Sequence, residues 1–239
     1  MRSIVLANQK GGVGKTTTAI HLAHGLALTG QRVCLFDLDP QGNATVAVQA
    51  MAEAAIASEE DLEGLTPVAQ NLWLLPSPGD GSTLARGATI DIAKLQELVD
   101  RMSDRVDWLV VDCPPRLDEW GWAGVQIAEQ VLVPVQAEFF AMHGLSQMLA
   151  SLEAAAIEFP GKAALRGVLP TMVDLREPLA EEILEDLRKN LGNRMLNTVI
   201  LRDTALVEAA SHGTSVFQHS PFSKSAFCYA QLVKELADG

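Results

Sequence analysis

The stretch that decides the fold is residues 10–17, which read Lys10-Gly11-Gly12-Val13-Gly14-Lys15-Thr16-Thr17. It follows an apolar run of strand length at 3–7 and opens a helix-period stretch at 16–28. Glycines let backbone N–H groups turn inward to form an anion-binding concavity, and the start of a helix adds the positive end of its dipole. This strand–loop–helix context predicts a phosphate loop.

The residue types in the loop assign roles around a nucleotide. Lys15 can reach the β- and γ-phosphates, and the Thr16 hydroxyl can ligate Mg²⁺. The nucleotide is expected to contact the whole loop: Lys10, Gly11, Gly12, Val13, Gly14, Lys15, Thr16 and Thr17. The alternative is a glycine-rich turn that only joins a strand to a helix.

One position departs from the usual GxxxxGK[ST] pattern, because its first residue is Gln9 and a second lysine, Lys10, follows it. Phosphates that already contact Lys15 are stabilised little further by a second cation on the same side. We therefore expect Lys10 to point away and to reach a nucleotide bound by a second subunit. The alternative is a solvated surface lysine.

Carboxylates follow two further apolar runs. Asp37 and Asp39 come after the run at 32–36, and residues two apart on an extended segment point the same way. Both can face a nucleotide at the carboxyl edge of the sheet, where one can hold Mg²⁺ and the other can orient or deprotonate water. Either could instead cap the next helix.

Asp112 ends the apolar run 108–111 and precedes Cys113-Pro114-Pro115. An acid in this place is expected on the Mg²⁺ side of a phosphate-loop enzyme. The predicted metal set is Thr16, Asp37, Asp39 and Asp112, and the predicted catalytic set is Lys10, Lys15 and Asp39. Asp112 could alternatively cap the following loop, and Cys113 is expected to be a packed residue.

Apolar runs without alternation, typical of strands covered on both faces, alternate with helix-period stretches along the 239 residues. This pattern predicts an α/β fold with a mainly parallel, twisted sheet and helices on both faces. Nothing divides the chain, so we expect one domain over 1–239. The predicted strands are 3–7, 32–36, 72–75, 108–111, 131–135, 167–169 and 198–200. The predicted helices are 16–28, 47–57, 90–102, 121–129, 145–159, 179–191, 204–211 and 224–236. Gly64, Pro67 and the run 76–81 are expected in loops.

Composition excludes several classes of protein. Hydrophobic residues make up 48%, enough to bury a core, and the net charge is −12. Residues 41–159 carry five basic and eighteen acidic side chains, so a polyanion-binding face is not expected there. Three distant cysteines argue against structural zinc or an iron–sulfur cluster. No run of about 18 apolar residues and no signal peptide are evident, so we expect a cytoplasmic protein that does not bind membranes.

Three motifs together resemble the ParA/Soj partition ATPases, deviant-Walker members of the superfamily that includes MinD. They are the run Asn8–Ala19, the run Asp37–Thr45 (Asp-Leu-Asp-Pro-Gln-Gly-Asn-Ala-Thr) and the run Val111–Pro115 (Val-Asp-Cys-Pro-Pro). Val133–Ala141, Gly144-Leu145, Thr171–Asp174 and Glu208-Ala209 extend the similarity over nearly the whole chain.

The resemblance implies a single-domain ATPase that binds ATP and Mg²⁺ and closes into a nucleotide-sandwich dimer. It makes Lys10 the signature lysine acting across the dimer, Asp39 the residue that positions the hydrolytic water, and Asp112 the Walker B acid. It also implies non-specific DNA binding by the ATP-bound dimer, association with the nucleoid, and a ParB-type partner that triggers hydrolysis.

The chain departs from the family near its C-terminus, where Ala205 stands at a position that often carries a DNA-binding arginine. Arg202 is retained but could equally be a nucleotide-side or structural residue. The candidate DNA contacts are Arg176, Arg188, Lys189, Arg202 and Lys224, each of which could also be a solvated cation. Because non-specific affinity is electrostatic, we expect DNA binding to be weak and steeply salt-sensitive.

Proteins with other functions carry the same type of phosphate loop. A MinD-like membrane cycle needs a basic amphipathic C-terminal helix, but residues 222–239 carry only two lysines. A cluster carrier needs cysteine pairs that are missing. A metabolic ligase or amidase should show a small-substrate pocket and no ATP-dependent dimer. The nearest alternative is a ParA-like ATPase that positions carboxysomes or chemoreceptor clusters, which differs in its partner.

Overall fold

A computed structural model describes residues 1–55, 62, 64–77, 85, 86, 89–115, 118–138 and 141–238. Its strands are β1 (Arg2–Leu6), β2 (Val33–Asp37), β3 (Thr66–Ala69), β4 (Leu72–Leu75), β5 (Ala85–Arg86), β6 (Thr89–Ile90), β7 (Trp108–Asp112), β8 (Gln130–Gln136) and β9 (Ala164–Thr171). Its α-helices are α1 (Lys15–Leu28), α2 (Asn43–Ala47), α3 (Gln49–Ala55), α4 (Ile92–Met102), α5 (Glu119–Ile127), α6 (Ala141–Glu158), α7 (Leu179–Leu191), α8 (Thr204–Ser211), α9 (Val216–His219) and α10 (Lys224–Ala237).

Seven strands form one twisted sheet in the order β3-β4-β2-β7-β1-β8-β9, in which every neighbouring pair except β3–β4 is parallel. The predicted α/β class and mainly parallel sheet are confirmed. The order reverses beside β1, the central strand that leads into the phosphate loop. Open α/β sheets bind ligands at the carboxyl edge next to such a reversal, so the topology itself points to the loop after β1.

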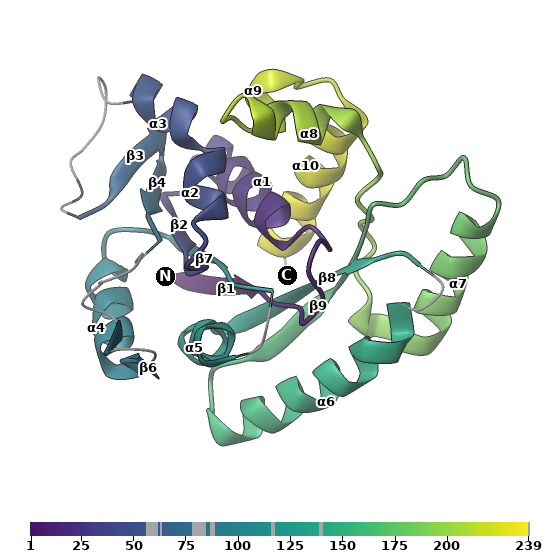
Figure 1. The fold of residues 1–239 in the computed structure, drawn as a ribbon, viewed down its shortest axis with the longest axis horizontal. Coiled ribbons are helices and arrows are strands. Elements are labelled where there is room, and N and C mark those ends of the chain that lie inside the picture. The colour runs from purple at the N-terminus through teal and green to yellow at the C-terminus, as the bar shows by residue number, and fades with distance from the viewer. Residues whose placement is uncertain are drawn as a thin grey trace.

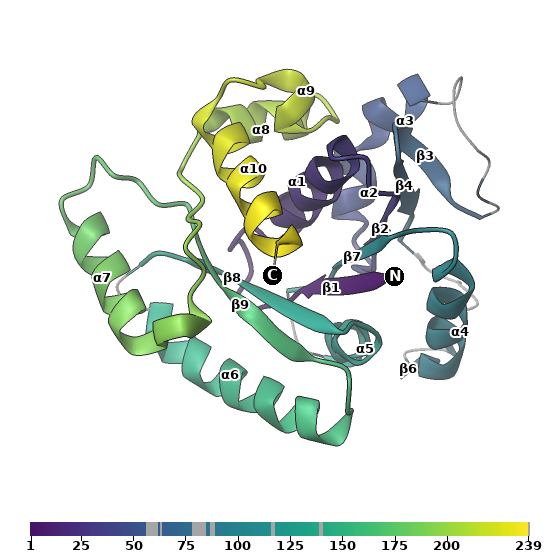
Figure 2. The same ribbon diagram turned by 180° about the vertical axis from the view of Figure 1, so that it is seen from behind.

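Helices cover both faces of the sheet (Figures 1 and 2). One core packs α4, α5, α6 and α7 against the sheet, and the other packs α1, α2, α3 and α10 against the opposite face. Alternate residues of β1 serve both cores, with Val5 in the first and Ile4 and Leu6 in the second. This two-sided burial explains the continuous apolar runs in the sequence.

The predicted strand at 198–200 is wrong. This segment runs beside β9 without joining the sheet as a strand, and isolated bridges flank it at Met195 and Leu201. The reason is a competing acceptor, because Glu235 of α10 takes the N–H groups of Asn197 and Thr198 at 2.8 and 2.9 Å. A side chain 37 or more residues away therefore supplies bonds that a strand neighbour would otherwise supply.

Pro67 was expected in a loop, yet it lies in β3 at the edge of the sheet. An edge strand tolerates proline because one of its sides needs no backbone donor. The helix expected at 47–57 begins only at Gln49, after the separate short helix α2, and positions 56–57 lie outside the described residues, as do 78–81.

Two helices begin at other residues than predicted, because a polar side chain caps the first turn of each. The helix expected from residue 90 begins at Ile92 because Asp91 caps it, and the helix expected from 121 begins at Glu119 because Asp118 accepts the N–H groups of Trp120 and Gly121. The extent of α7 and α8 and the position of β4 match the predicted ranges.

Glu235→Gln is expected to lower the free energy of unfolding by about 1–3 kcal/mol, because the charged acceptor for the Asn197 and Thr198 N–H groups is lost. Urea denaturation measures this change. The matched control is Lys234→Gln, which removes a charge from the exposed face of the same helical turn and should stay within about 0.5 kcal/mol of the wild type. Equal effects of the two substitutions would contradict a specific role for Glu235.

Candidate functional site

The phosphate loop lies between β1 and α1 and is held from neighbouring strands. Asn8 donates from Nδ2 to the carbonyl of Pro134 at 2.7 Å, and its Oδ1 accepts the N–H of Lys10 at 2.9 Å. Thr171, at the end of β9, donates its hydroxyl to the carbonyl of Val13 at 2.9 Å. These bonds from β8 and β9 fasten both sides of the loop, so its conformation is set before any ligand binds.

Two glycines of the loop need their conformational freedom. Gly12 has φ 73° and Gly14 has φ 87°, both in the left-handed region that favours glycine. Gly14 immediately precedes Lys15, the first residue of α1, so the backbone turns into the helix there. The first N–H groups of α1 consequently face the inside of the loop, where an anion would bind.

The two lysines of the loop diverge. Lys15 is buried, and its Nζ donates to the carbonyl of Lys10 at 3.1 Å, so it spans the inside of the loop. Burial lowers the pKa of Lys15, while the carboxylates of Asp112 and Asp39 act in the opposite direction. The Lys10 side chain is 56% exposed and forms an ion pair with Glu138 at 3.0 Å. This side chain therefore leaves the inside of its own loop, and its expected contact with a nucleotide of a second subunit stays a prediction.

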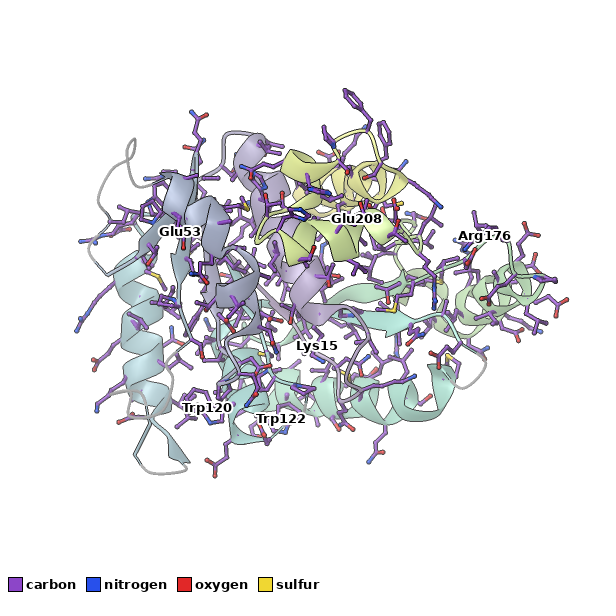
Figure 3. The ribbon with its side chains drawn as sticks, turned by 45° about the horizontal axis from the view of Figure 1, so that its top comes forward. Lys15, Glu53, Trp120, Trp122, Arg176 and Glu208 are labelled. Atoms are coloured by element: carbon purple, nitrogen blue, oxygen red, sulfur yellow. The ribbon has the colours of Figure 1, made fainter. Side chains whose placement is uncertain are left out.

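The carboxyl edge of the sheet brings the predicted acids together. Asp37 of β2 and Asp112 of β7 are register partners in adjacent parallel strands, and Leu6 of β1 is the partner of Asp112 on the other side. All three aspartates are buried, including Asp39 just beyond β2. Figure 3 labels Lys15 at the start of α1, above Trp120 and Trp122 of α5 in this view.

Asp112 is the distinctive group of the site. Neither of its oxygens is exposed, and neither accepts a hydrogen bond from a described residue. Burial raises the pKa of this carboxyl to about 8, and the negative charges of Asp37 and Asp39 raise it too, whereas Thr16 and Lys15 oppose the rise. A buried carboxylate without partners is costly unless a cation neutralises it. Asp112 with the Thr16 hydroxyl therefore fits Mg²⁺, a hard cation that prefers oxygen ligands.

Both carboxylate oxygens of Asp37, which was predicted to hold Mg²⁺, accept hydrogen bonds from the protein. Its Oδ1 accepts the N–H of Asp39 at 3.2 Å, and its Oδ2 accepts both the N–H and the hydroxyl of Thr45 at 2.8 and 2.7 Å. Asp37 thus holds the turn that leads from β2 into α2. Asp39 keeps more freedom, because among the described residues only its Oδ1 accepts a hydrogen bond, from the N–H of Gln41 at 2.9 Å.

A cleft of about 420 Å³ adjoins the phosphate loop. Its lining includes Gly14 and Thr17, mostly apolar groups of α8, and Tyr229 of α10. Met172, also in the lining, has φ 56°, an uncommon conformation for a residue other than glycine. Residue patterns in the sequence did not reveal this cleft, because its lining comes from four separate parts of the chain.

The five cations predicted to contact DNA do not form one cluster. Arg202 lies near Arg176 at Asp174 and near Lys224 at Asp203, whereas the other two stand apart from them. Arg188 and Lys189 lie in the last turn of α7, in one helical layer, whereas Lys224 begins α10 in the other. Arg202 lines the cleft. Arg176, at the outer end of the α7 side in Figure 3, is paired with Asp174 at 2.5 Å.

The pairing of Arg176 holds the pKa of the Asp174 carboxyl well below its usual range and engages the guanidinium. Ala205, where an arginine would bind DNA in the family resemblance, is buried in α8 against α9 and α10. No helix in the described part of the chain is long and apolar enough to cross a membrane.

Comparisons with known proteins agree with this site. A family model described as an AAA domain matches residues 1–160. The chain is 42% identical to the chromosome-partitioning ATPase Soj of Thermus thermophilus, covering 99% of this chain and 95% of that protein. It is 34% identical to the sporulation initiation inhibitor protein Soj of Bacillus subtilis, covering 98% and 97%.

Among solved structures, cobyrinic acid a,c-diamide synthase of Mycobacterium smegmatis with bound ADP and magnesium superimposes with a TM-score of 0.76 at 27% identity. The match covers 99% of this chain and 94% of that one. A nucleotide and magnesium therefore bind to a fold of this kind.

Asp112→Asn is expected to flatten the pH dependence of stability in the nucleotide-free protein. Because the pKa of Asp112 is raised from 3.8 to about 8 on folding, the protonated carboxyl stabilises the fold at low pH, and this contribution is lost as the pH rises through about 8. Without Mg²⁺, the melting temperature of the wild type should fall more steeply from about pH 5 to about pH 9 than that of the variant. Parallel curves would contradict the raised pKa.

Proposed function

Because the chain belongs to the Soj/ParA family of chromosome-partitioning ATPases, we propose that it is an ATP-hydrolysing switch that segregates or positions DNA as a nucleotide-sandwich dimer. The observation that carries the proposal is the divergence of Lys15 and Lys10 from one loop. One lysine serves the chain's own nucleotide and the other is available to a partner. We treat residues 1–239 as one ATPase unit.

In this proposal the nucleotide lies along the loop and into the cleft. The β- and γ-phosphates meet the N–H groups of 11–17 and the ammonium of Lys15, and the base occupies the apolar cleft that starts at Gly14 and Thr17. Arg202, at the cleft, is then a nucleotide-side residue instead of a DNA contact. Mg²⁺ would be held by Thr16 and Asp112 and would neutralise the charge that develops on the phosphates.

Asp39 is the proposed water-positioning group. It lies at the same edge as Asp112, and its Oδ2 accepts no hydrogen bond from the described residues. A carboxylate in this place can orient the attacking water and accept its proton. Asp37 supports it by holding the turn, which replaces the metal role expected of Asp37 from the sequence.

Lys10 completes the site of the second subunit. A cation supplied to the transferring phosphoryl group from a partner contributes about 10³–10⁵ in rate in related reactions. In the single chain Lys10 is paired with Glu138, so closing the dimer requires this exposed ion pair to break. Exposed pairs contribute only about 0–1 kcal/mol, which a bound nucleotide can readily offset.

The activator is proposed to be a ParB-type protein, as the family resemblance implies, and nucleoid association would follow from DNA binding. That binding is expected to be weak, because Arg176 is already paired with Asp174 and the chain carries a charge of −12. The alternative is a ParA-like ATPase that positions another large cargo. It shares the nucleotide chemistry, and a pull-down of the ATP-bound protein that recovers a cargo protein instead of a DNA-binding activator would favour it.

Lys10→Ala should leave ATP affinity within about threefold of the wild type but abolish ATP-dependent dimerisation. Size-exclusion chromatography with ATPγS measures the dimer, and a titration measures affinity. The matched variant is Glu138→Gln, which frees Lys10 and should increase the dimer fraction. A normal dimer from Lys10→Ala would contradict the role of Lys10.

Asp39→Ala should form a stable ATP dimer whose hydrolysis is slower by about 10²–10⁴. Phosphate release measures turnover, and wild-type turnover in the variant would exclude Asp39 as the water-positioning group. The trapped dimer is also the sample for DNA binding. Its log K should fall steeply with log salt, and a flat line would refute electrostatic DNA binding.

A further inference from the structure

Two helices from the C-terminal part of the chain contribute to the lining of the cleft. Leu206 and Val207 of α8 and Tyr229 of α10 all belong to its lining. The two helices also contribute to one small core, in which Ala205 and Ala209 of α8 and Ala226 of α10 are joined by Val216 of α9. The spacing between α8 and α10 therefore determines the shape of the cleft.

One carboxylate links the starts of both helices. Asp203 Oδ1 accepts the N–H of Ala205 in α8 at 3.2 Å. Asp203 Oδ2 accepts the N–H and the hydroxyl of Ser225 in α10 at 3.1 and 3.0 Å. The first N–H groups of a helix have no partner inside the helix, so each depends on such an acceptor. Asp203 itself lies in the lining of the cleft.

Tyr229, in the lining of the cleft, contacts the phosphate-loop helix. The Tyr229 hydroxyl lies 3.3 Å from the Thr18 hydroxyl, and its ring stacks on His21 with centroids 4.7 Å apart. Thr18 follows Thr17, which lines the cleft. A shift of the first turn of α10 would consequently move Tyr229 relative to the loop that holds the phosphates.

We propose that Asp203 is a positioning residue that holds α8 and α10 at the spacing the base of ATP requires, without contacting the phosphates. This inference rests on the proposed function, because it takes the cleft to be the base site. It predicts a selective defect: binding that depends on the base weakens, while binding that depends only on phosphates does not change.

Glu235 provides a matched control at the other end of α10. It is also a carboxylate that accepts backbone N–H groups from a distant segment, those of Asn197 and Thr198, but it is absent from the described lining of the cleft. Loss of either tie should lower the melting temperature. Only loss of the Asp203 hydrogen bonds should weaken binding of the base of ATP.

The experiment measures the dissociation constants of Mg·ATP and of Mg·tripolyphosphate, which has no base, for the full chain and for Asp203→Ala, Asp203→Asn and Glu235→Gln. Asp203→Ala should weaken ATP binding about fivefold to tenfold, while tripolyphosphate binding stays within about twofold. Asp203→Asn, which keeps a neutral acceptor, should fall between the wild type and Asp203→Ala. It also serves if the alanine variant does not fold. Glu235→Gln should bind both probes as the wild type does.

Equal weakening of both probes by the Asp203 variants would overturn the inference, because Asp203 would then act only through overall stability. Unchanged ATP binding in a folded Asp203 variant, or the same selective loss in Glu235→Gln, would also overturn it. If the wild-type chain bound neither ATP nor tripolyphosphate, the proposed function itself would fail. If it bound both probes equally well, the cleft would not be the base site.

Discussion

The hydrogen bond from Lys15 Nζ to the carbonyl of Lys10 draws one lysine across the inside of the phosphate loop. The side chain of Lys10 leaves in another direction and meets Glu138. The two ammonium groups thus leave the loop in different directions, one toward its inside and one toward Glu138. An ATP-closed dimer depends on this divergence, because it leaves one lysine available to a second nucleotide.

The fold supplies the rest of the site through the positions of strand ends. Asp112 ends β7 between β1 and β2, so the phosphate loop and the turn after β2 flank it. Its buried carboxyl has no described hydrogen-bond donor, and burial raises its pKa to about 8. A cation held at this carboxyl would offset the cost of burying its charge.

Features that depend on local residue patterns could be predicted from the sequence. The phosphate loop, the run of β4 and the length of α7 follow from glycine spacing and apolar periodicity. Contacts between distant residues could not be predicted in this way. Glu235 accepts a backbone N–H from the segment 198–200, where a strand was expected. Thr45 donates to Asp37, and Glu138 pairs with Lys10, which lies 128 positions earlier in the chain. In each case a polar side chain meets its partner only because the chain folds. The cleft could not be predicted for the same reason, since residues from separate parts of the chain line it.

The most direct test of a lysine that acts across the dimer is a mixture of two inactive variants. In a mixed dimer of Lys10→Ala and Asp39→Ala, the Lys10→Ala subunit keeps its own Asp39 and receives Lys10 from its partner. The account predicts that mixing restores ATP hydrolysis at one of the two sites. If Lys10 acted on the nucleotide of its own chain, both sites would lack an essential group. A mixture as inactive as its two components, with mixed dimers demonstrated, would contradict the account.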